Sequence, residues 1–286
     1  MQKLASMPRP PDNSSHARAA TKRRQAAARD RKPPLRLQPT TLWDYPSQNY
    51  GTGRQGDEKY PGVTPSYVIW NLLQRYTAEV ELVIDSFAGS GTTLDVAADL
   101  NRRARGFDLA PTHSQIERAD ARALPMPGHS ADFVFIDPPY STHIDYSDDA
   151  RCIGKLDAST PAYYDAMDQV FAEIERILKP GRHMAVYVTD SYVHTGQGRG
   201  FWPIGFELFS LLRRRFEPVD IIAVTRHNKT LEMGNYRRAA EEGNFFLRGF
   251  NYVFIMRKPA PRLPPKSKPR GGGGPKPWFK YRKPKR

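Results

Sequence analysis

The sequence predicts an α/β fold, in which one mostly parallel β-sheet is covered by helices on both faces. From Leu42 onward, short runs rich in β-branched residues alternate with amphipathic helical patterns, and the runs are apolar throughout rather than at every second position. Strands of a parallel sheet have this pattern because both of their faces are buried. The runs that we expect to form the core strands are Val80–Ile84, Phe133–Ile136, Met184–Val188, Ile221–Val224 and Tyr252–Met256.

Two helices are expected between the later strands. From Ala162 to Leu178, apolar residues recur every three or four positions, and Lys179-Pro180-Gly181 follows as a stop signal. A second helix is expected from Ile204 to Phe216. It ends in three arginines, Arg213 to Arg215, whose positive charge suits the negative end of a helix dipole.

Charge divides the 286 residues into three parts. Residues 1–40 hold 10 Lys/Arg and two Asp/Glu, residues 259–286 hold 10 Lys/Arg and no acid, and residues 41–258 between them have a net charge of −4. Both ends are rich in Pro and poor in aliphatic residues, so we expect two flexible basic arms around one globular domain. Such arms either contact the phosphates of a nucleic acid, which the motifs below favour, or serve only as solubility tails.

Composition argues against several classes of protein. One cysteine, Cys152, cannot form an intrachain disulfide, nor a thiolate metal site by itself. No apolar run reaches the ~20 residues that span a bilayer, and the N-terminus lacks the apolar core of a signal peptide. We therefore expect a soluble, cytoplasmic protein that binds no metal and no membrane.

A glycine-rich turn follows the first core strand and precedes a helical pattern. In open α/β sheets, ligands bind at this point, beyond the carboxyl ends of the strands. Gly89 and Gly91 allow a tight turn and a close approach of the backbone to a ligand, and Thr92 or Thr93 is expected to cap the helix. The segment reads Asp85-Ser-Phe-Ala88-Gly-Ser-Gly-Thr-Thr93.

Two acids after this turn fit a nucleoside. Asp108 ends the next strand-like run, where a carboxylate can accept hydrogen bonds from ribose hydroxyls. Asp120 precedes a turn, where it either accepts from an adenine amino group or only stabilises the turn. A dinucleotide fingerprint would need a third glycine at Leu94, and a P-loop would need Gly-Lys-Ser/Thr, so neither motif is present.

A second motif, Asp137-Pro138-Pro139-Tyr140, ends the predicted strand Phe133–Ile136. The prolines remove two N–H donors and stiffen the chain, so that carbonyl oxygens can face a ligand. An amino group on a nucleic-acid base is a poor nucleophile, because its lone pair is delocalised. Hydrogen bonds from it to the Asp137 carboxylate and the Pro138 carbonyl would favour an attacking geometry. Tyr140 would stack on a base taken out of the duplex.

These motifs resemble those of the S-adenosylmethionine-dependent DNA amino-methyltransferases, which modify adenine N6 or cytosine N4. Phe87 to Gly91 matches the family's cofactor motif, and Asp137 to Tyr140 matches its catalytic motif. The segment from Thr64 to Gln74 resembles the helix that precedes the cofactor strand and lines the methionine end of the cofactor pocket. The resemblance covers about residues 42–257 and leaves the arms outside.

The resemblance implies a Rossmann-like class I methyltransferase sheet of seven strands, mostly parallel with one antiparallel strand near Tyr252–Met256. S-adenosylmethionine is the implied cofactor, and DNA is the implied partner. The catalytic residues implied are Asp137, Pro138, Pro139 and Tyr140. The cofactor-binding residues implied by the motifs and their neighbours are Thr64, Asp85, Phe87, Ala88, Gly89, Gly91, Thr92, Thr93, Asp108 and Asp120.

Target recognition is expected from two connections, because no long insertion is left for it within the resemblance. These are the loop Ser141–Asp157 and the segment Arg226–Phe250, in which basic and aromatic residues are mixed. For any single residue, a solvated loop position is an equal alternative. The candidate nucleic-acid-binding residues are His143, Tyr146, Arg226, His227, Lys229, Arg237, Arg238 and Arg248.

The expected reaction is methyl transfer to an exocyclic amino group of a flipped DNA base. Adenine N6 is favoured over cytosine N4, because Asp at the first position of the catalytic motif is commoner in the family's adenine enzymes. Cytosine C5 methylation would need a nucleophilic Cys after a Pro, whereas Cys152 follows Arg151. Two alternatives remain open: an RNA base amino-methyltransferase, and a catalytically silent subunit of this fold that binds nucleic acid for a partner.

Overall fold

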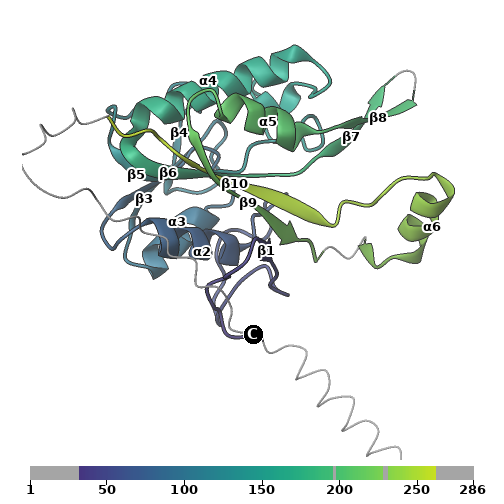
Figure 1. Cartoon of the computed structure of the whole chain (residues 1–286), viewed down its shortest axis with the longest axis horizontal. Helices are drawn as coiled ribbons and strands as arrows, with labels where there is room; N and C mark the ends of the chain where they lie inside the picture. Colours follow the sequence, from purple (N-terminus) through teal and green to yellow (C-terminus); the bar gives the residue numbers. More distant parts are fainter. Residues whose placement is uncertain (1–31, 196–197, 228–230, 262–286) are drawn as a thin grey trace, which may run out of the picture.

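The computed structural model describes residues 32–195, 198–227 and 231–261 (Figure 1). Its main strands are β1 (Leu42–Trp43), β2 (Leu82–Asp85), β3 (Arg103–Asp108), β4 (Ile116–Arg118), β5 (Ala131–Ile136), β6 (Leu178–Val188), β9 (Glu217–Thr225) and β10 (Phe250–Arg257). The helices are α2 (Ser66–Tyr76), α3 (Thr92–Asp99), α4 (Pro161–Ile177), α5 (Ile204–Leu212) and α6 (Gly234–Glu242), with a 3-10 turn at Ile153–Lys155. A separate hairpin pairs β7 (Ser191–Thr195) with β8 (Gly198–Trp202).

The described residues form an eight-stranded sheet in the order β1-β9-β10-β6-β5-β2-β3-β4. The strands are parallel except β10, which is antiparallel to both β6 and β9. The predicted α/β class, the five core strands and the antiparallel last strand are confirmed. The count of seven strands is corrected to eight, because Leu42 and Trp43 add β1 to the edge of β9. A strand of two residues is too short to be recognised in the sequence by an alternating or a continuous apolar pattern.

Three predicted element ends need correction. The first core strand was expected to begin at Val80, but β2 begins at Leu82, and Val80 precedes it in a turn with φ +58° and is exposed. The helix expected from Ile204 to Phe216 ends at Leu212, and the three arginines follow it in tight turns, in which the Arg215 N–H donates to the Leu212 carbonyl at 3.0 Å. The residues Lys179 to Gly181, which were expected to stop helix α4, do not form a loop. The helix does end at Ile177, but β6 begins at the next residue and includes Lys179 to Gly181.

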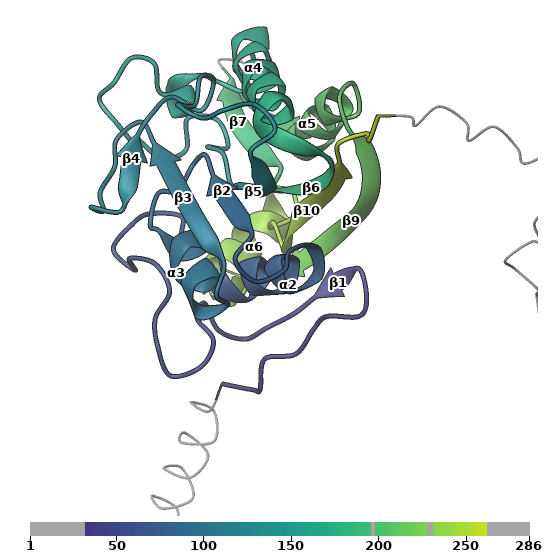
Figure 2. The ribbon, with the colours of Figure 1, turned by 90° about the vertical axis from the view of Figure 1, so that its left-hand side faces the viewer.

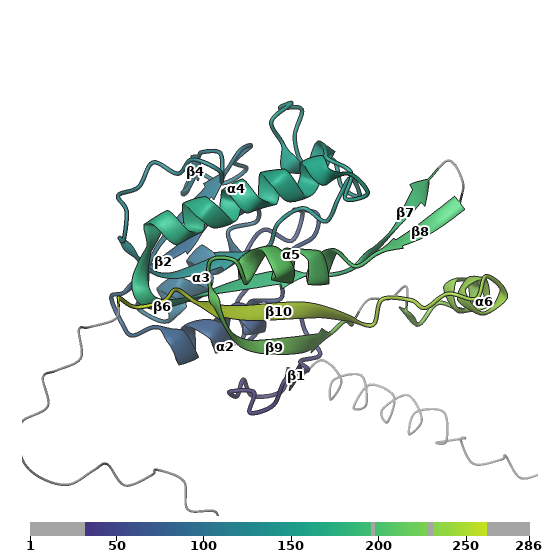
Figure 3. The same cartoon turned by 45° about the horizontal axis from the view of Figure 1, so that its top comes forward.

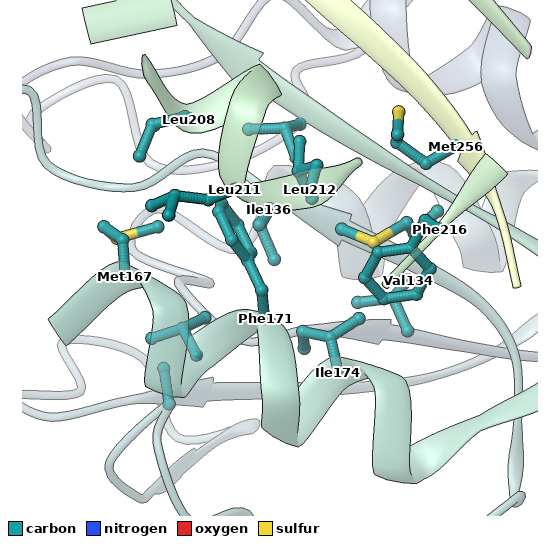
Figure 4. Close-up of a cluster of buried hydrophobic side chains, with 14 of the residues drawn as sticks. Val134, Ile136, Met167, Phe171, Ile174, Leu208, Leu211, Leu212, Phe216 and Met256 are labelled. Carbon is teal, nitrogen blue, oxygen red and sulfur yellow. The ribbon is translucent and has the colours of Figure 1, made fainter. Parts of the chain in front are cut away.

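The sheet separates two hydrophobic clusters. One lies against α4 and α5 and includes Phe171 (Figure 4), and the other lies against α2 and α3. In β5, Val134 and Ile136 face the first cluster, whereas Phe133 and Phe135 face the second. Figure 2 shows the same layering, with α4 and α5 on one face of the sheet and α2 and α3 on the other. Each fully buried side chain of this kind contributes about 1.5–3 kcal/mol.

The topology gathers several connections at one edge of the sheet. Strands β2, β3, β5, β6 and β9 run parallel, so their carboxyl ends share this edge, and antiparallel β10 begins there. The β7–β8 hairpin follows β6, and α6 connects β9 to β10. Both extend beyond the body of the protein in the same direction (Figure 3). Among the described helices, none is long and apolar enough to cross a membrane.

Residues 33–40, which the sequence assigns to the basic N-terminal arm, lie against the domain. The Gln38 N–H donates to Asn71 Oδ1 of α2 at 2.8 Å, and the Tyr45 hydroxyl donates to the Pro33 carbonyl at 2.9 Å. The remainder of that arm, residues 1–31, and residues 262–286 of the other arm lie outside the described residues.

Candidate active site

A cavity of about 510 Å³ lies at the carboxyl ends of β2, β3 and β5. Asp85 ends β2, Asp108 ends β3 and Asp137 follows β5, so parallel pairing brings three carboxyl groups from distant parts of the sequence to one place. The volume is in the range of small-molecule sites. Of the residues predicted from the sequence, those that line the cavity are Thr64, Asp85, Phe87, Ala88, Gly89, Thr92, Thr93, Asp108, Asp120, Asp137, Pro139, Tyr140, His143, Tyr146, Arg226 and Arg248.

The glycine turn is held by hydrogen bonds of its own. The Asp85 carboxylate accepts from the Phe87 N–H at 3.0 Å and from the Thr93 hydroxyl at 2.5 Å. Gly89 and Gly91 have φ angles of +41° and +81°, in a backbone region that residues other than glycine rarely adopt. The turn therefore needs its glycines, and the buried Asp85 acts within the turn itself.

Helix α3 begins differently from the expectation. Its N-cap is Gly91, and neither Thr92 nor Thr93 caps it. Both threonines lie inside the first helical turn, where their hydroxyls find other partners. Thr92 Oγ1 lies 2.8 Å from Ser90 Oγ, and Thr93 donates to Asp85. The capping prediction is therefore wrong, and the threonines instead tie the glycine turn together.

The two acids predicted to hold a nucleoside both reach the cavity. Asp108 accepts from the backbone N–H groups of Gly89 and Ala110 at 3.0 and 2.9 Å, and a carboxylate has about four acceptor positions, so capacity remains for a ligand hydroxyl. Asp120 accepts from the Arg122 backbone N–H at 3.0 Å and pairs with its guanidinium at 2.6 Å. Burial opposes ionisation of Asp120, but these bonds outweigh it and lower the pKa of the carboxyl group. The turn-stabilising interaction is thus present, and the adenine contact stays a prediction.

Hydroxyl groups hold the Asp137 carboxylate from both sides. The Thr64 hydroxyl donates to Oδ2, and the Tyr140 hydroxyl donates to Oδ1. Thr64 precedes α2 and lies 73 positions away from Asp137 in the sequence. The fold therefore couples Thr64, predicted only as a cofactor contact, directly to the catalytic motif.

Burial raises the pKa of both carboxyl groups in the centre of the cavity. For Asp137 it outweighs the hydrogen bonds from Thr64 and Tyr140, the nearby Asp85 adds to the rise, and the pKa reaches about 7. The pKa of Asp85 also rises to about 7, because burial outweighs the bonds from Thr93 and Phe87. A carboxyl group with a pKa near neutrality is typical of functional sites.

The rest of the catalytic motif is tied to the protein on both sides. Pro138 is buried, and the Pro139 carbonyl accepts from the Tyr163 hydroxyl of α4 at 2.8 Å. Ser141 follows with φ +65°, and its hydroxyl oxygen accepts from the Ala158 N–H at 2.9 Å. The motif is therefore rigidly placed, while the acceptor role of the Pro138 carbonyl stays a prediction.

The candidate nucleic-acid residues fall into two groups. His143, Tyr146, Arg226 and Arg248 line the cavity. The His143 imidazole is hydrogen-bonded to the Ser191 hydroxyl, and burial lowers the pKa of this ring. The ring is therefore neutral at neutral pH.

The second group lies away from the cavity. The His227 side chain pairs with Asp44, and Arg237 and Arg238 lie on the exposed helix α6. Gly91 and Pro138 are likewise absent from the described cavity wall. Lys229 falls outside the described residues.

Two polar residues, Tyr60 and Asn251, stand out among the cavity-wall residues that were not predicted from the sequence. Tyr60 packs so closely on the glycine turn that a Cβ on Gly89 would lie 2.7 Å from its ring. The same ring stacks on Tyr146, with centroids 6.1 Å apart. Asn251 of β10 is 7% exposed and lies on the opposite part of the wall. Its only signal in the sequence is an amide at the start of an apolar strand, and the polar loop that holds Tyr60 gives none.

Fold and site together define a class of protein. A mostly parallel sheet with antiparallel β10 between β6 and β9, a glycine turn after β2 and Asp-Pro-Pro-Tyr after β5 define an S-adenosylmethionine-dependent methyltransferase with a Rossmann-like fold. Within this class the chain belongs to the DNA methylase family, whose model matches residues 5–118 and 131–279. This confirms the family predicted from the motifs, and the match extends beyond residues 42–257. No curated protein sequence matches the chain significantly.

Several solved structures are similar to the chain. TTHA0409 of Thermus thermophilus, provisionally assigned as a DNA modification methylase, is 24% identical, with a TM-score of 0.36 over 52% of this chain and 54% of that one. TrmN of Thermus thermophilus is 18% identical, with a TM-score of 0.43 over 69% of this chain and 50% of that one. The [4+2]-cyclase SpnF is 17% identical, with a TM-score of 0.44 over 69% and 82%.

Proposed function

We propose that this DNA methylase transfers a methyl group from S-adenosylmethionine to an exocyclic amino group of a DNA base, with adenine N6 favoured over cytosine N4, after flipping the base out of the duplex. The main support for the proposal is the position of the Asp137 side chain. Its carboxyl group is partly buried beside Tyr140, in the same cavity as the glycine turn. A stacked base cannot enter such a cavity, so the geometry favours flipping.

The cavity residues near β2 and β3 suit the cofactor. Asp108 would accept from the ribose hydroxyls and Asp120 from the adenine amino group, while the left-handed backbone at Gly89 lets the chain approach the ligand closely. Thr64 lies where the cofactor and the catalytic motif meet. The cofactor supplies a methyl group that already carries its leaving group, so no covalent bond to the protein is needed.

The catalytic motif prepares the acceptor. Hydrogen bonds from the amino group to the Asp137 carboxylate and the Pro138 carbonyl would fix its two hydrogens and leave the nitrogen lone pair pointing at the methyl group. Positive charge grows on this nitrogen during the transfer, so its attraction to the carboxylate is stronger in the transition state than in the ground state. Such a difference lowers the barrier. The methylated nitrogen would then lose its extra proton to the Asp137 carboxylate, which passes it to water.

Tyr140 has two roles in this proposal. Its hydroxyl occupies Asp137 Oδ1, which is an acceptor that the target amino group needs. Binding of the base would exchange the hydroxyl for the amine and leave the ring to stack on the base, while Thr64 keeps Oδ2 in place.

Cytosine C5 methylation is disfavoured further, because burial raises the pKa of the Cys152 thiol and so suppresses its nucleophilic form.

The test is single-turnover methylation of duplex DNA, with mass spectrometry of the nucleosides and a parallel titration with S-adenosylmethionine. Asp137→Ala is expected to slow methyl transfer by on the order of 10³-fold or more, because the amine loses its partner in the transition state, with little change in cofactor affinity. Tyr140→Ala is expected to weaken binding of the flipped base by roughly 1–3 kcal/mol. Normal turnover by Asp137→Ala would exclude the mechanism, and methylcytosine as the product would reverse the order of targets.

A further inference from the structure

Two segments project from the edge of the sheet at which the cavity lies. The β7–β8 hairpin continues from the carboxyl end of β6, and the connection with α6 leaves the carboxyl end of β9 and returns at the start of β10 (Figures 1 and 3). Where these segments join the sheet, three of their residues line the cavity: Ser191 at the start of β7, Arg226 after β9 and Arg248 before β10. Anything bound between these segments therefore lies over the cavity.

Helix α6 is not part of the core. None of its nine residues is buried, and its apolar positions, Tyr236, Ala239 and Ala240, do not pack into the core. Tyr236, Arg237 and Arg238 occupy its first half and are exposed. Packing against the rest of the protein stabilises this polar helix little. We therefore infer that its exposed side chains contact a partner.

Phe246 lies in the connection that returns from α6 to β10. It is 81% exposed, the highest value among the large hydrophobic side chains of the described residues. Arg248 ties this part of the connection to its surroundings: its guanidinium donates to the Phe246 carbonyl at 2.9 Å and lies 5.2 Å from the centre of the Phe201 ring of β8. Arg248 also lines the cavity. An exposed aromatic ring is thus held two residues from the cavity wall.

We propose that the described residues of the α6 connection (231–249) and of the β7–β8 hairpin (191–195 and 198–202) form a surface for duplex DNA, and that Phe246 enters the base stack at the position that the flipped base leaves. The inference rests on the proposed base-flipping function and adds to it the residue that stabilises the opened duplex. Phe246, Arg248 and α6 carry it.

Duplex DNA is the occupant that fits this surface. Its phosphates suit the guanidinium groups of Arg226, Arg237, Arg238 and Arg248, which spread along the connection from the cavity to α6. Flipping a base costs stacking energy and leaves a gap between two base pairs, and an apolar side chain inserted between base steps recovers part of this loss. Exposure of Phe246 to water costs free energy in the absence of DNA, and this cost is relieved when the ring is stacked.

The first experiment compares Phe246→Ala with the parent on three substrates of one sequence: a duplex, the single strand, and a duplex with an abasic site opposite the target. Phe246→Ala is expected to slow single-turnover methylation of the duplex by about 5-fold or more, since stacking contacts of this kind are worth at least that factor. Methylation of the single strand should be unchanged, because no gap has to be filled. The abasic duplex, whose target has no pairing partner, should restore most of the rate.

Two variants control this comparison. Phe246→Trp keeps a stacking ring and should retain the rate on the duplex. Phe206→Ala removes another exposed phenylalanine, 54% exposed on α5, and should behave as the parent on all three substrates. Fluorescence of 2-aminopurine at the target position reports flipping directly and should increase less with Phe246→Ala than with the parent.

The outcomes separate this inference from the proposed function. Failure of the parent to methylate any of the three substrates would reject the DNA function. If the parent methylates all three and Phe246→Ala matches it on the intact duplex, the wedge is rejected while the function stands. An equal loss on the duplex and the single strand would also reject the wedge, because it would show a general defect in the cavity.

A second experiment addresses α6. Replacing Arg237 and Arg238 by Gln should weaken duplex binding and reduce the salt dependence of its affinity by up to about two phosphate contacts. The matched control replaces Glu241 and Glu242, on the last turn of the same helix, by Gln and should not weaken binding. Equal salt slopes for the parent and the arginine variant would remove α6 from the DNA surface.

Discussion

The two ends of the active-site cavity are built in opposite ways. Around the glycine turn, carboxylates are held by hydrogen bonds within the protein: Asp85 accepts from Phe87 and Thr93, and Asp108 accepts from Gly89. Around β9 and β10, the connections leave the core, α6 buries no residue and Phe246 is exposed. The end that we assign to the cofactor is therefore pre-organised, whereas the end that we assign to DNA presents an exposed surface.

This difference between the two ends matches the size and charge of the ligand proposed for each. A small cofactor buries little area, so a site for it benefits from groups that are already fixed before binding. A duplex brings many phosphates and stacked bases and can order exposed segments at its own cost in entropy. Asp137 stands between the two ends, since it contacts Thr64 on the cofactor side and Tyr140 on the base side.

The largest effect that tests this comparison is on stability, at Asp137. Burial raises the pKa of its carboxyl group to about 7, so the folded protein holds this proton from about pH 4 to 7 while the unfolded chain releases it. Stability therefore falls as pH rises through this range and stays lower above it. Asp137→Asn should raise the free energy of unfolding at pH 8 by on the order of 2–4 kcal/mol, and change it little at pH 4.

Urea denaturation of the parent and Asp137→Asn at both pH values measures this effect, with methylation assayed on the same samples. Asp132, which is paired with Lys179 at 2.6 Å, provides the contrast, because its pKa is lowered and its Asn variant should lose stability at pH 8. If Asp137→Asn is no more stable than the parent at pH 8, the carboxyl group is not strained by burial.

An intermediate effect is expected on cofactor affinity at Asp108. Asp108→Ala should weaken binding of S-adenosylmethionine by about 10- to 100-fold, because hydrogen bonds to a charged group contribute roughly 1.5–3 kcal/mol. Calorimetric titration gives the dissociation constant, and Phe246→Ala serves as the control at the other end of the cavity. Unchanged affinity of Asp108→Ala would show that Asp108 serves only the turn.

The smallest effect is expected from the basic arms. Residues 1–31 and 262–286 together hold 18 Lys/Arg and two Asp/Glu. Deleting both segments should weaken DNA binding and flatten its salt dependence without changing cofactor affinity, since charge in these segments acts through counterion release. Fluorescence anisotropy at several salt concentrations gives the slope, and an unchanged slope would return the arms to the role of solubility tails.

The sequence predicted the cofactor end of the cavity better than the DNA end. The strand, glycine turn and helix from Leu82 to Asp99 form a local unit, in which buried apolar residues and φ-positive glycines leave a clear pattern. Asp137 follows a fully buried strand and was predicted for the same reason. These features depend on neighbours in the sequence.

What the sequence could not predict depends on topology. Thr64 meets Asp137 only because α2 and β5 are brought together by the sheet, and Tyr60 meets Gly89 only because a polar loop folds back over the turn. The expectation that Thr92 or Thr93 caps α3 failed for a related reason, since Ser90 and Asp85 compete for their hydroxyls. Propensity describes a residue's preference and not the partners that the fold supplies.

The position of β10 has a consequence for how the protein is made. This strand is the last of the described sheet in the sequence, yet it lies between β6 and β9, so its pairings with both strands can form only after residues 250–257 have been synthesised. Within the described sheet, β6 and β9 are joined only through their pairings with β10. Asn251 and Arg248 therefore join the cavity wall together with the closing of the sheet. A nascent chain that has not reached these residues therefore lacks part of the cavity wall on the side that we assign to the base.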